Sequence, residues 1–449
     1  MLASPDPHRV FAADPANVRS QYEALPYPPR QAADERQRLL RTWLEDLAMI
    51  NHYCYAGRQD FRGGFRALIA GGGTGDATIF LAEQLRGTTA QIVHLDFSLA
   101  SIAIARQRAA IRKLNNIVWV HDALLNLPTL GLGKFDYINC SGVLHHLPDP
   151  DAGLRALLAV LKEDGALGMM VYASYGRTGV YQLQTLLRLL QDGVTDDAAR
   201  LAHASAVLQC LPASHWFKRG EDLHQDHKIG DAGIYDLLLH GQDRSYTVGE
   251  VFDWFQEQHA LHLNFSDVQR GRAAYLPHLM AGRHSFPGLD AIQAAPLRRQ
   301  HEIAELLTGD LIMHTFYATP SGDRTAPYGD PDYVPFYYHE PLDGETLAKV
   351  FGVNRGQPFA FHHSHSGVSV MLDPGRHGTS ILRLIDGQRS FGQIFSLLQA
   401  MQASTGQRPA SYPEFFADFR ACFEVLNAIE RLLLRHCSVV PLQPAVARP

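Results

Sequence analysis

Residues 67–76 read Ala67-Leu-Ile-Ala-Gly71-Gly72-Gly73-Thr74-Gly75-Asp76, an apolar run that ends in four glycines within five residues. The apolar part has the composition of a buried strand, and a helical amphipathic pattern resumes over residues 77–85. Glycines at positions 71, 73 and 75 let the backbone turn tightly and let a ligand approach the main chain. The stretch therefore predicts a strand, a ligand-binding turn and a helix.

A second run, Ile92-Val-His-Leu-Asp96, follows one helix later and ends in an acidic residue. In a Rossmann-like sheet, an acidic residue at the tip of the second strand holds two ribose hydroxyls. The glycine spacing is G-x-G-x-G, whereas a dinucleotide site has G-x-G-x-x-G. Asp76 stands where the third glycine would fall, and its carboxylate would repel a phosphate at the helix N-terminus. We therefore expect a nucleoside cofactor without phosphate and disfavour a nicotinamide oxidoreductase.

These features and three further segments resemble the class I S-adenosylmethionine (SAM)-dependent methyltransferases. Asp122-Ala123 matches the adenine-edge position, Phe135-Asp-Tyr-Ile-Asn-Cys-Ser-Gly-Val-Leu-His-His-Leu147 matches the fourth strand and the segment after it, and Lys162-Glu-Asp-Gly165 matches the turn before the fifth strand. Ile69 is a departure, because the family usually has an acidic residue there. The resemblance implies an α/β fold with a Rossmann-like seven-stranded sheet, SAM as cofactor and S-adenosyl-L-homocysteine as its product.

Composition indicates an ordinary globular protein. Of the 449 residues 46% are hydrophobic, and the net charge is -6 without Lys/Arg runs, which does not fit a nucleic-acid surface. Five cysteines without C-x-x-C spacing suit reduced thiols in a cytoplasmic protein. No signal-peptide pattern and no apolar stretch of membrane-spanning length are evident. The expected partner is a small-molecule substrate, with a homodimer left open and neither nucleic acid nor membrane expected.

The chain divides into three parts. Residues 1–30 contain Tyr27-Pro28-Pro29, so we expect residues 16–30 to be extended rather than helical. This part resembles a segment that covers the SAM pocket in a subset of bacterial methyltransferases, and a strap on the sheet edge is the alternative. Residues 31–320 form the predicted methyltransferase domain, with a helical insertion at 175–258 after the fifth strand. A Gly/Pro/Asp-rich linker then leads to a loosely placed, mainly helical C-terminal domain at 336–449.

Within the C-terminal domain, residues 378–394 resemble winged-helix peptide-binding domains of the PqqD type, and a long helix is expected over residues 415–437. The alternative is a helical cap that packs on the first domain or on a second copy of the chain.

Ligands of open parallel sheets bind beyond the carboxyl ends of the strands. The loops at 71–76, 96–98, 122–124, 139–146 and 173–178 are therefore predicted to surround one pocket. The predicted cofactor-binding residues are Tyr22, Tyr27, Gly71, Gly73, Gly75, Asp96, Phe97, Asp122, Ala123 and Ser141.

Methyl transfer from a sulfonium requires orientation and exclusion of water, and a base only where the acceptor arrives protonated. The candidate catalytic residues are His145 and His146, which follow the fourth strand, and Tyr172, which ends the fifth. The alternatives are a structural or SAM-contacting role for the two histidines and core packing for Tyr172.

The insertion carries the candidate substrate-binding residues Tyr175, His240, Asp243, Arg244 and Tyr246. The planar guanidinium of Arg244 could hold a substrate carboxylate. The equally weighted alternative is an Asp243–Arg244 network that caps the helix beginning at Thr247.

Two histidine clusters, His224-Gln-Asp-His227 and His362-His363-Ser-His365, invite a metal hypothesis. Neither shows a helical i, i+4 pair with a carboxylate partner, so we expect loop or pocket histidines and no metal.

The leading function is methyl transfer from SAM to a small polar acceptor. The alternatives are a protein or peptide methyltransferase whose C-terminal domain presents the substrate, and a non-catalytic SAM-binding regulator. The sequence does not identify the acceptor atom.

Overall fold

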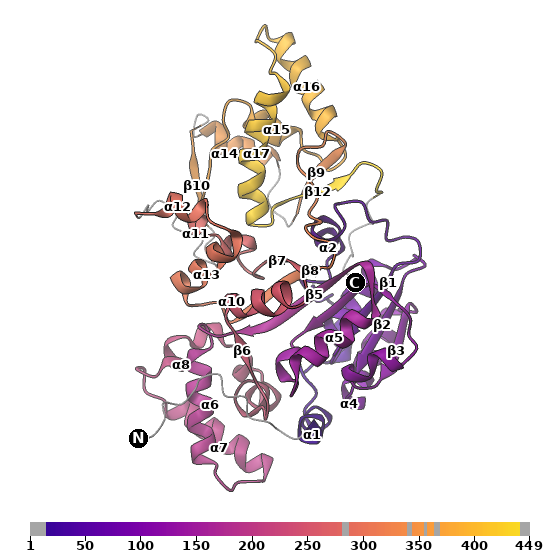
Figure 1. Ribbon diagram of the computed structural model, residues 1–449, viewed down its shortest axis with the longest axis vertical. Helices are drawn as coiled ribbons and strands as arrows, with labels where there is room; N and C mark the ends of the chain where they lie inside the picture. Colours follow the sequence, from indigo (N-terminus) through magenta and orange to yellow (C-terminus); the bar gives the residue numbers. More distant parts are fainter. Residues whose placement is uncertain (1–14, 281–286, 339–343, 354–356, 363–368, 441–449) are drawn as a thin grey trace.

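The computed structural model describes residues 15–280, 287–338, 344–353, 357–362 and 369–440. Its centre is a mixed sheet whose strands follow the order β3-β2-β1-β4-β5-β8-β7 (Figure 1). These strands are β1 Arg66–Ala70, β2 Gln91–Asp96, β3 Ile117–His121, β4 Phe135–Ser141, β5 Leu161–Ala173, β7 His262–Phe265 and β8 Met313–Thr319. The first five in this order are parallel, and β8 is antiparallel to both β5 and β7. The α/β fold class is thus confirmed.

One more short strand joins this sheet than the seven expected. Strand β6 (Ser245–Tyr246) pairs in parallel with Tyr172 and Ala173 at the carboxyl end of β5. Through β6 the chain passes from the insertion back to the sheet, at the carboxyl end of β5 where the pocket is predicted. The described residues therefore form an eight-stranded sheet in which the eighth strand lies off the main path.

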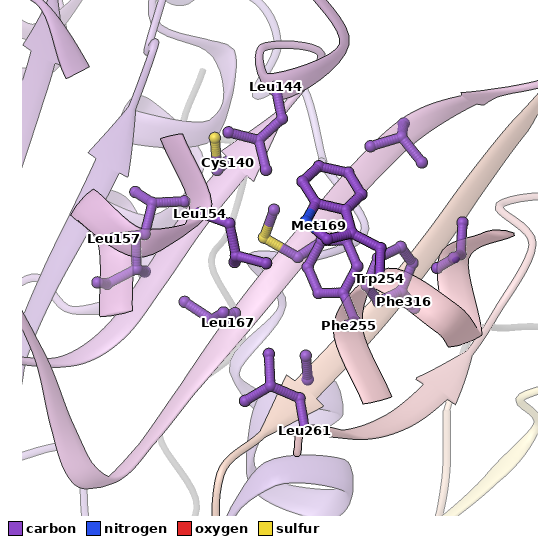
Figure 2. Close-up of a cluster of buried hydrophobic side chains, with 14 of the residues drawn as sticks. Cys140, Leu144, Leu154, Leu157, Leu167, Met169, Trp254, Phe255, Leu261 and Phe316 are labelled. Carbon is purple, nitrogen blue, oxygen red and sulfur yellow. The ribbon is translucent and has the colours of Figure 1, made fainter. Parts of the chain in front are cut away.

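Both faces of the sheet are buried, as a parallel sheet with near-continuous apolar strands requires. In β1, Leu68 and Ala70 belong to the hydrophobic cluster on one face, and Ala67 and Ile69 belong to the cluster on the other. Figure 2 shows the first cluster, where Met169 of β5 lies among side chains that include Trp254 and Phe255. Ile69, the departure from the family pattern, is a core residue.

Polar caps fix the starts of the helices that cover the sheet. These helices are α2 (Leu47–Cys54), α3 (Asp76–Gln84), α4 (Leu99–Arg112), α5 (Pro150–Val160) and α10 (Val248–Val251). Ser98 accepts a hydrogen bond from Ser101 N at the start of α4, and Asp149 accepts one from Ala152 N at the start of α5. Thr247 and Glu250 form a reciprocal capping box at α10. Polar side chains therefore set where α4, α5 and α10 begin, whereas α3 follows Gly75 and has no side-chain cap.

The insertion forms a helical unit with a core of its own. Its helices are α6 (Thr178–Leu190), α7 (Asp197–Cys210), α8 (Trp216–Arg219) and α9 (Asp231–Ile234), and a π-helical turn follows at Tyr235–Leu239. Val180, Leu183 and Phe217 are fully buried in this core. Three helices follow the insertion and β7 in the chain and precede β8. They are the short α11 (Pro277–Met280) and α12 (Leu289–Gln293) and the longer α13 (Leu297–Thr308).

The extended conformation predicted for residues 16–30 is wrong in its first half. Helix α1 spans Pro15–Ala24, and residues 25–30, which contain Pro26, Pro28 and Pro29, form neither helix nor strand. A proline restricts itself and the residue before it, so Pro26, Pro28 and Pro29 do not prevent a helix upstream. Residues 1–14 lie outside the described residues.

The C-terminal unit contains strand pairs as well as helices. Its helices are α14 (Gly344–Val353), α15 (Gly378–Leu384), α16 (Phe391–Ser404) and α17 (Tyr412–Ala428), and its strands are β9 (Tyr333–Tyr337), β10 (Phe359–His362), β11 (Ser369–Leu372) and β12 (Leu432–His436). The helix predicted over 415–437 therefore ends at Ala428. Glu430 then adopts a positive φ of 54°, and β12 pairs with β9.

The expectation that the C-terminal unit is loosely placed is wrong. Its Leu433 is buried in the same cluster as α2, and Leu434 N donates a 3.1 Å hydrogen bond to His52 Nδ1. Asn427 Nδ2 lies 3.2 Å from His52 Nε2, and both residues are buried. Shared core residues and buried hydrogen bonds fix the unit on the sheet, so the Gly/Pro/Asp-rich segment is not a flexible tether.

Candidate active site

The glycine-rich turn follows β1 at the carboxyl edge of the sheet. Gly71, Gly73 and Gly75 have φ values of 73°, 50° and 101°, which residues with a Cβ rarely adopt. A Cβ at Gly73 would lie 2.9 Å from the carbonyl oxygen of Tyr27, and one at Gly71 would lie 2.3 Å from Val143 Cγ2. The turn is therefore packed closely on both the fourth-strand loop and the N-terminal segment.

Asp96 ends β2 directly beside this turn. Its Oδ2 accepts a 2.7 Å hydrogen bond from Gly73 N, and its Oδ1 accepts a 2.8 Å hydrogen bond from Ser98 N. Burial raises the pKa of Asp96, although the hydrogen bonds from Ser98 and Gly73 oppose that effect. Each carboxylate oxygen has a second lone pair, so both can still accept from a ligand hydroxyl.

The remaining predicted cofactor residues lie on the neighbouring strand ends. Asp122 N donates to Asp96 O at 3.1 Å, which brings the loop after β3 next to that after β2. The Asp122 side chain accepts from Asn126 Nδ2 and from Ala123 N, both at 2.7 Å, and these bonds lower its pKa. Ser141 is the last residue of β4. The structure thus places Asp122, Ala123 and Ser141 around the same edge as Asp96.

The N-terminal segment lies over the turn and contacts the insertion. Thr74 Oγ1 donates to Pro28 O at 2.7 Å, and the ring of Tyr22 packs edge-on against Phe97 with centroids 5.8 Å apart. The Tyr22 hydroxyl donates to Asp236 and the Tyr27 hydroxyl donates to Asp226, each at 2.9 Å. Tyr22 and Tyr27 therefore link the predicted cofactor loops to the insertion.

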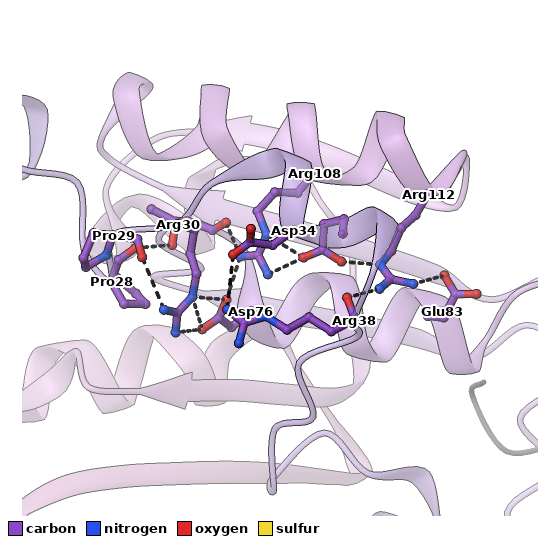
Figure 3. Close-up of polar contacts among 11 residues, drawn as sticks. Pro28, Pro29, Arg30, Asp34, Arg38, Asp76, Glu83, Arg108 and Arg112 are labelled. Carbon is purple, nitrogen blue, oxygen red and sulfur yellow. Dashed lines mark hydrogen bonds and ion pairs between the residues drawn. The ribbon is translucent and has the colours of Figure 1, made fainter. Parts of the chain in front are cut away.

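A buried ionic network fixes the base of this segment (Figure 3). Arg30 donates three hydrogen bonds to Asp76, the shortest 2.6 Å from Nη2 to Oδ2, and Arg108 Nη1 donates a 2.6 Å bond to the same carboxylate. Burial opposes ionisation of Asp76, but the two guanidinium groups outweigh it and lower its pKa. Arg108 also pairs with Glu35 at 2.7 Å.

This network changes the interpretation of Asp76. Two arginines neutralise its carboxylate, so Asp76 does not by itself repel an anion at the helix N-terminus. Only the glycine spacing, and not this charge, therefore disfavours a phosphate-bearing cofactor. Asp76 instead ties the glycine-rich turn to the N-terminal segment.

Four rings form a compact cluster where β4 and β5 end: His145, His146, Tyr172 and His240. The ring centroids of His145 and Tyr172 are 3.9 Å apart, as are those of His146 and His240. His145 is fully buried, and neither of its ring nitrogens has a hydrogen-bond partner. Burial, reinforced by the neighbouring His146 and Arg177, lowers the pKa of His145 well below its usual value. His145 is therefore a neutral imidazole with a free lone pair.

Hydrogen bonds to Gln242 assign the tautomers of the other two histidines. Gln242 O accepts at 2.8 Å from His146 Nδ1, which therefore carries a proton. Gln242 N donates at 3.1 Å to His240 Nδ1, so the neutral His240 carries its proton on the buried, unpartnered Nε2. Burial also lowers the pKa of His240. The cluster thus offers both hydrogen-bond donors and acceptors.

Three residues that sequence reasoning missed complete this region. Arg177 lies over Tyr172 and pairs with Asp243, Tyr181 donates to Asp243 at 3.1 Å, and Asp236 accepts from Tyr22. Burial raises the pKa of Asp236. Arg177 stands inside a loop that was expected to line the pocket, and Asp236 is the one charged residue in the apolar run 234–239. Both residues could therefore have been proposed as site residues from the sequence.

The structure separates the predicted substrate-binding residues into two groups. His240 and Asp243 lie in or beside the ring cluster, and Tyr175 is 41% exposed at the start of the insertion. The Arg244 guanidinium instead lies over the Tyr246 ring at 4.6 Å and pairs with Glu250 at 3.6 Å. Arg244 and Tyr246 both line an acidic surface pocket of about 300 Å³, with Asp149, Pro150, Asp151, Glu250, Asp253, Trp254 and Gln258.

The histidines of the first predicted cluster have protein partners. His224 Nε2 lies 3.1 Å from Gly176 O, and His227 Nε2 lies 3.0 Å from Glu221 Oε1. In the described ranges no group of three or more His, Cys, Asp or Glu side chains has the arrangement of a metal site. His363 and His365 lie outside the described residues. None of the helices that the structure describes is long and apolar enough to cross a membrane.

Comparisons with known proteins agree with this architecture. A sequence profile of the family described as a methyltransferase domain matches residues 68–167. An uncharacterised protein of Synechococcus sp. is 30% identical over 345 residues, which cover 75% of this chain and 80% of the relative. The demethylmenaquinone methyltransferase of Oceanobacillus iheyensis is 33% identical over 108 residues, and the match covers 24% of this chain and 44% of that enzyme.

Solved structures extend the likeness beyond the methyltransferase profile. PKMT2 from Rickettsia typhi superimposes with a TM-score of 0.58 at 15% identity, covering 91% of this chain and 77% of PKMT2. The same protein in complex with AdoHcy gives a TM-score of 0.53 at 16% identity, covering 93% of this chain and 76% of PKMT2. At this level of identity the comparison establishes the fold, including the arrangement of the parts outside residues 68–167.

Proposed function

Because the chain belongs to the class I SAM-dependent methyltransferases, with SAM as its cofactor and S-adenosyl-L-homocysteine as the product, we propose that it methylates a small polar acceptor. SAM supplies an electrophilic methyl group that is displaced in line by a nucleophile. The observation that carries the proposal is the buried ring cluster of His145, His146, Tyr172 and His240, which adjoins the predicted cofactor loops.

The residues present fit a nucleoside cofactor at the carboxyl edge of β1, β2 and β3. Gly71 and Gly73 hold a turn whose backbone a side chain would obstruct. Asp96 keeps two lone pairs for the ribose hydroxyls, and Asp122 lies on the adjacent loop for the adenine edge. In this proposal Tyr22 and Tyr27 close over the pocket from the N-terminal segment and exclude water from the reacting centre.

On the acceptor side we assign His145 as the base where the acceptor arrives protonated. A neutral imidazole with no internal hydrogen bond can take a proton from an acceptor O–H or N–H. His240 can donate from Nε2, and Tyr172 can orient the acceptor from the end of β5. Their role is to orient a nucleophile in a dry site, which can account for several orders of magnitude in rate, roughly 7–11 kcal/mol in well-oriented reactions.

Burial and position support a small acceptor. His145, His146 and His240 are each less than a tenth exposed, so a folded protein surface cannot reach them without opening the insertion. The C-terminal unit lies on the far side of the sheet from α6–α8 (Figure 1). Its buried hydrogen bonds include those to His52 of α2 and to Ser266, which directly follows β7. This arrangement disfavours substrate presentation by the C-terminal unit of the same chain.

Labelling with SAM tests the proposal. The full-length protein is incubated with methyl-labelled SAM and a cell extract, and the label is followed separately in the small-molecule and protein fractions. We expect label in the small-molecule fraction, reduced on the order of a hundredfold by His145→Ala if His145 is the base. His259→Ala is the matched control, because His259 bonds Asp151 away from the cluster.

The other outcomes identify the alternatives. Label confined to protein would favour the protein or peptide methyltransferase. Tight SAM binding without transfer to either fraction would favour the non-catalytic regulator.

A further inference from the structure

Arg177 is a buried cation that the protein leaves partly unsatisfied. Its side chain is 4% exposed, and its guanidinium carbon lies 3.5 Å from the centroid of the Tyr172 ring. Neither Nε nor Nη2 has a hydrogen-bond partner. Buried polar groups are nearly always hydrogen-bonded, and an unpaired charged donor is especially unfavourable. The two unused donors are therefore available to a ligand group.

Asp243 neutralises Arg177 without using these donors. The Arg177 Nη2 and Asp243 Oδ2 atoms are 3.5 Å apart and form an ion pair but no hydrogen bond. Asp243 instead accepts from Tyr181 at 3.1 Å and from Gln184 Nε2 at 3.0 Å, both on α6. The Asp243 carboxylate is thus held by neutral donors, and Nε and Nη2 of Arg177 keep hydrogen-bonding capacity for another acceptor beside Asp243.

Arg177 adjoins the ring cluster through Tyr172. Tyr172 lies between Arg177 and His145, since both contact its ring. Arg177 precedes α6 directly, so its backbone is fixed by the helix while its guanidinium is fixed by stacking. A fixed planar guanidinium binds a carboxylate through two parallel hydrogen bonds, which a flexible ammonium cannot do.

We propose that Arg177 binds a carboxylate of the methyl acceptor, so that the substrate is an organic acid. The inference rests on the proposed function and names the substrate class of the same site. SAM also carries a carboxylate, on its methionine part, and the same group could recognise that one. We assign the acceptor because Arg177 follows β5 on the insertion side, whereas the predicted cofactor residues lie at the ends of β1 to β4 and in the N-terminal segment.

Calorimetry on the full-length protein separates these sources. S-adenosyl-L-homocysteine is titrated first into wild type, Arg177→Gln, Arg177→Lys and Arg219→Gln. Benzoate and acetate are then titrated into each protein saturated with that nucleoside, with benzamide as the uncharged counterpart of benzoate. Arg219 is the matched control, because it also lies over an aromatic ring in the insertion (Trp216, 5.1 Å) but at the surface.

The proposal requires nucleoside affinity within about threefold of wild type in Arg177→Gln, together with carboxylate binding weakened by at least about tenfold. Arg177→Lys should restore part of the carboxylate affinity, Arg219→Gln should match wild type, and benzamide should not bind. Because Arg177→Gln leaves Asp243 unpaired, the neutral double variant Arg177→Gln/Asp243→Asn is measured beside it.

Two outcomes overturn the assignment while leaving the proposed function intact. One is that wild type binds the nucleoside but neither carboxylate. The other is that Arg177→Gln loses affinity for S-adenosyl-L-homocysteine, which would assign Arg177 to the cofactor. Failure of wild type to bind S-adenosyl-L-homocysteine would overturn the proposed function itself.

Discussion

Replacing Asp96 tests the predicted cofactor site most directly. The Asp96→Ala substitution removes a buried carboxylate whose oxygens lie 2.7 Å from Gly73 N and 2.8 Å from Ser98 N. Two hydrogen bonds to ribose hydroxyls would be lost with it, each worth about 1.5–3 kcal/mol when the acceptor is charged. At the lower value the two bonds together contribute about 3 kcal/mol, and even half of this total, about 1.5 kcal/mol, corresponds to a roughly tenfold change in Kd. We therefore expect SAM to bind at least about tenfold more weakly.

The measurement has to separate ribose binding from support of the glycine-rich turn, because Asp96 also holds Gly73 N. Isothermal titration with adenosine and 3′-deoxyadenosine makes this separation: wild type should prefer adenosine, and Asp96→Ala should not. Ser98→Ala is the matched control, since it removes the α4 cap and leaves the carboxylate in place. A SAM affinity of Asp96→Ala within about twofold of wild type would refute the predicted site.

Three further predictions concern the segments around the pocket. Deleting residues 1–30 should leave the protein folded, as judged by circular dichroism. The Kd for SAM should rise about tenfold, because the contacts of Tyr22 and Arg30 are lost. Unchanged turnover would show that the segment has only a structural role. Arg244→Ala removes a partly exposed ion pair with Glu250, so the free energy of unfolding should fall by less than about 1 kcal/mol. The KM for the acceptor should stay within about threefold of wild type. A larger rise in KM would indicate that Arg244 binds the substrate carboxylate. Burial raises the pKa of Glu430 to about 8, so the folded state binds this proton more tightly than the unfolded state, and stability should fall as the pH rises from about 4.5 to about 8. Glu430→Gln should therefore have a higher thermal midpoint than wild type near about pH 9 and a similar one near about pH 5, and an equal difference at both would contradict the burial argument.

The core of the fold could be predicted because local signals and long-range packing agree there. The apolar run before Gly71 and the one before Asp96 form β1 and β2, and they pair in parallel register from Arg66 to Ala70. Continuous apolar strands have few alternatives to burial between two helical layers. The positions of the loops at the carboxyl edge then follow from the topology alone.

The acceptor side could be predicted only in part, since it depends on which way each side chain of the insertion points. His240 and Arg244 are four residues apart, yet the first lies in the ring cluster and the second lines the surface pocket. The chain turns between them at Gln242, whose backbone bonds both His146 and His240. The geometry of this turn depends on the contact between Gln242 and His146, which are 96 residues apart in the chain, and no local sequence pattern predicts such a contact. The docking of the C-terminal unit escaped prediction for the same reason, because the hydrogen bond between His52 and Leu434 joins residues 382 positions apart in the sequence.

Tyr22 connects the two halves of the site. Its ring packs on Phe97 beside the predicted ribose site and lies 6.0 Å from the His240 ring, while its hydroxyl donates to the buried Asp236. Any movement of the N-terminal segment that opens the cofactor side must therefore break a hydrogen bond on the acceptor side. Arg30 and Asp76 hold the same segment to the glycine-rich turn. The N-terminal segment therefore contacts both the predicted cofactor loops and the ring cluster.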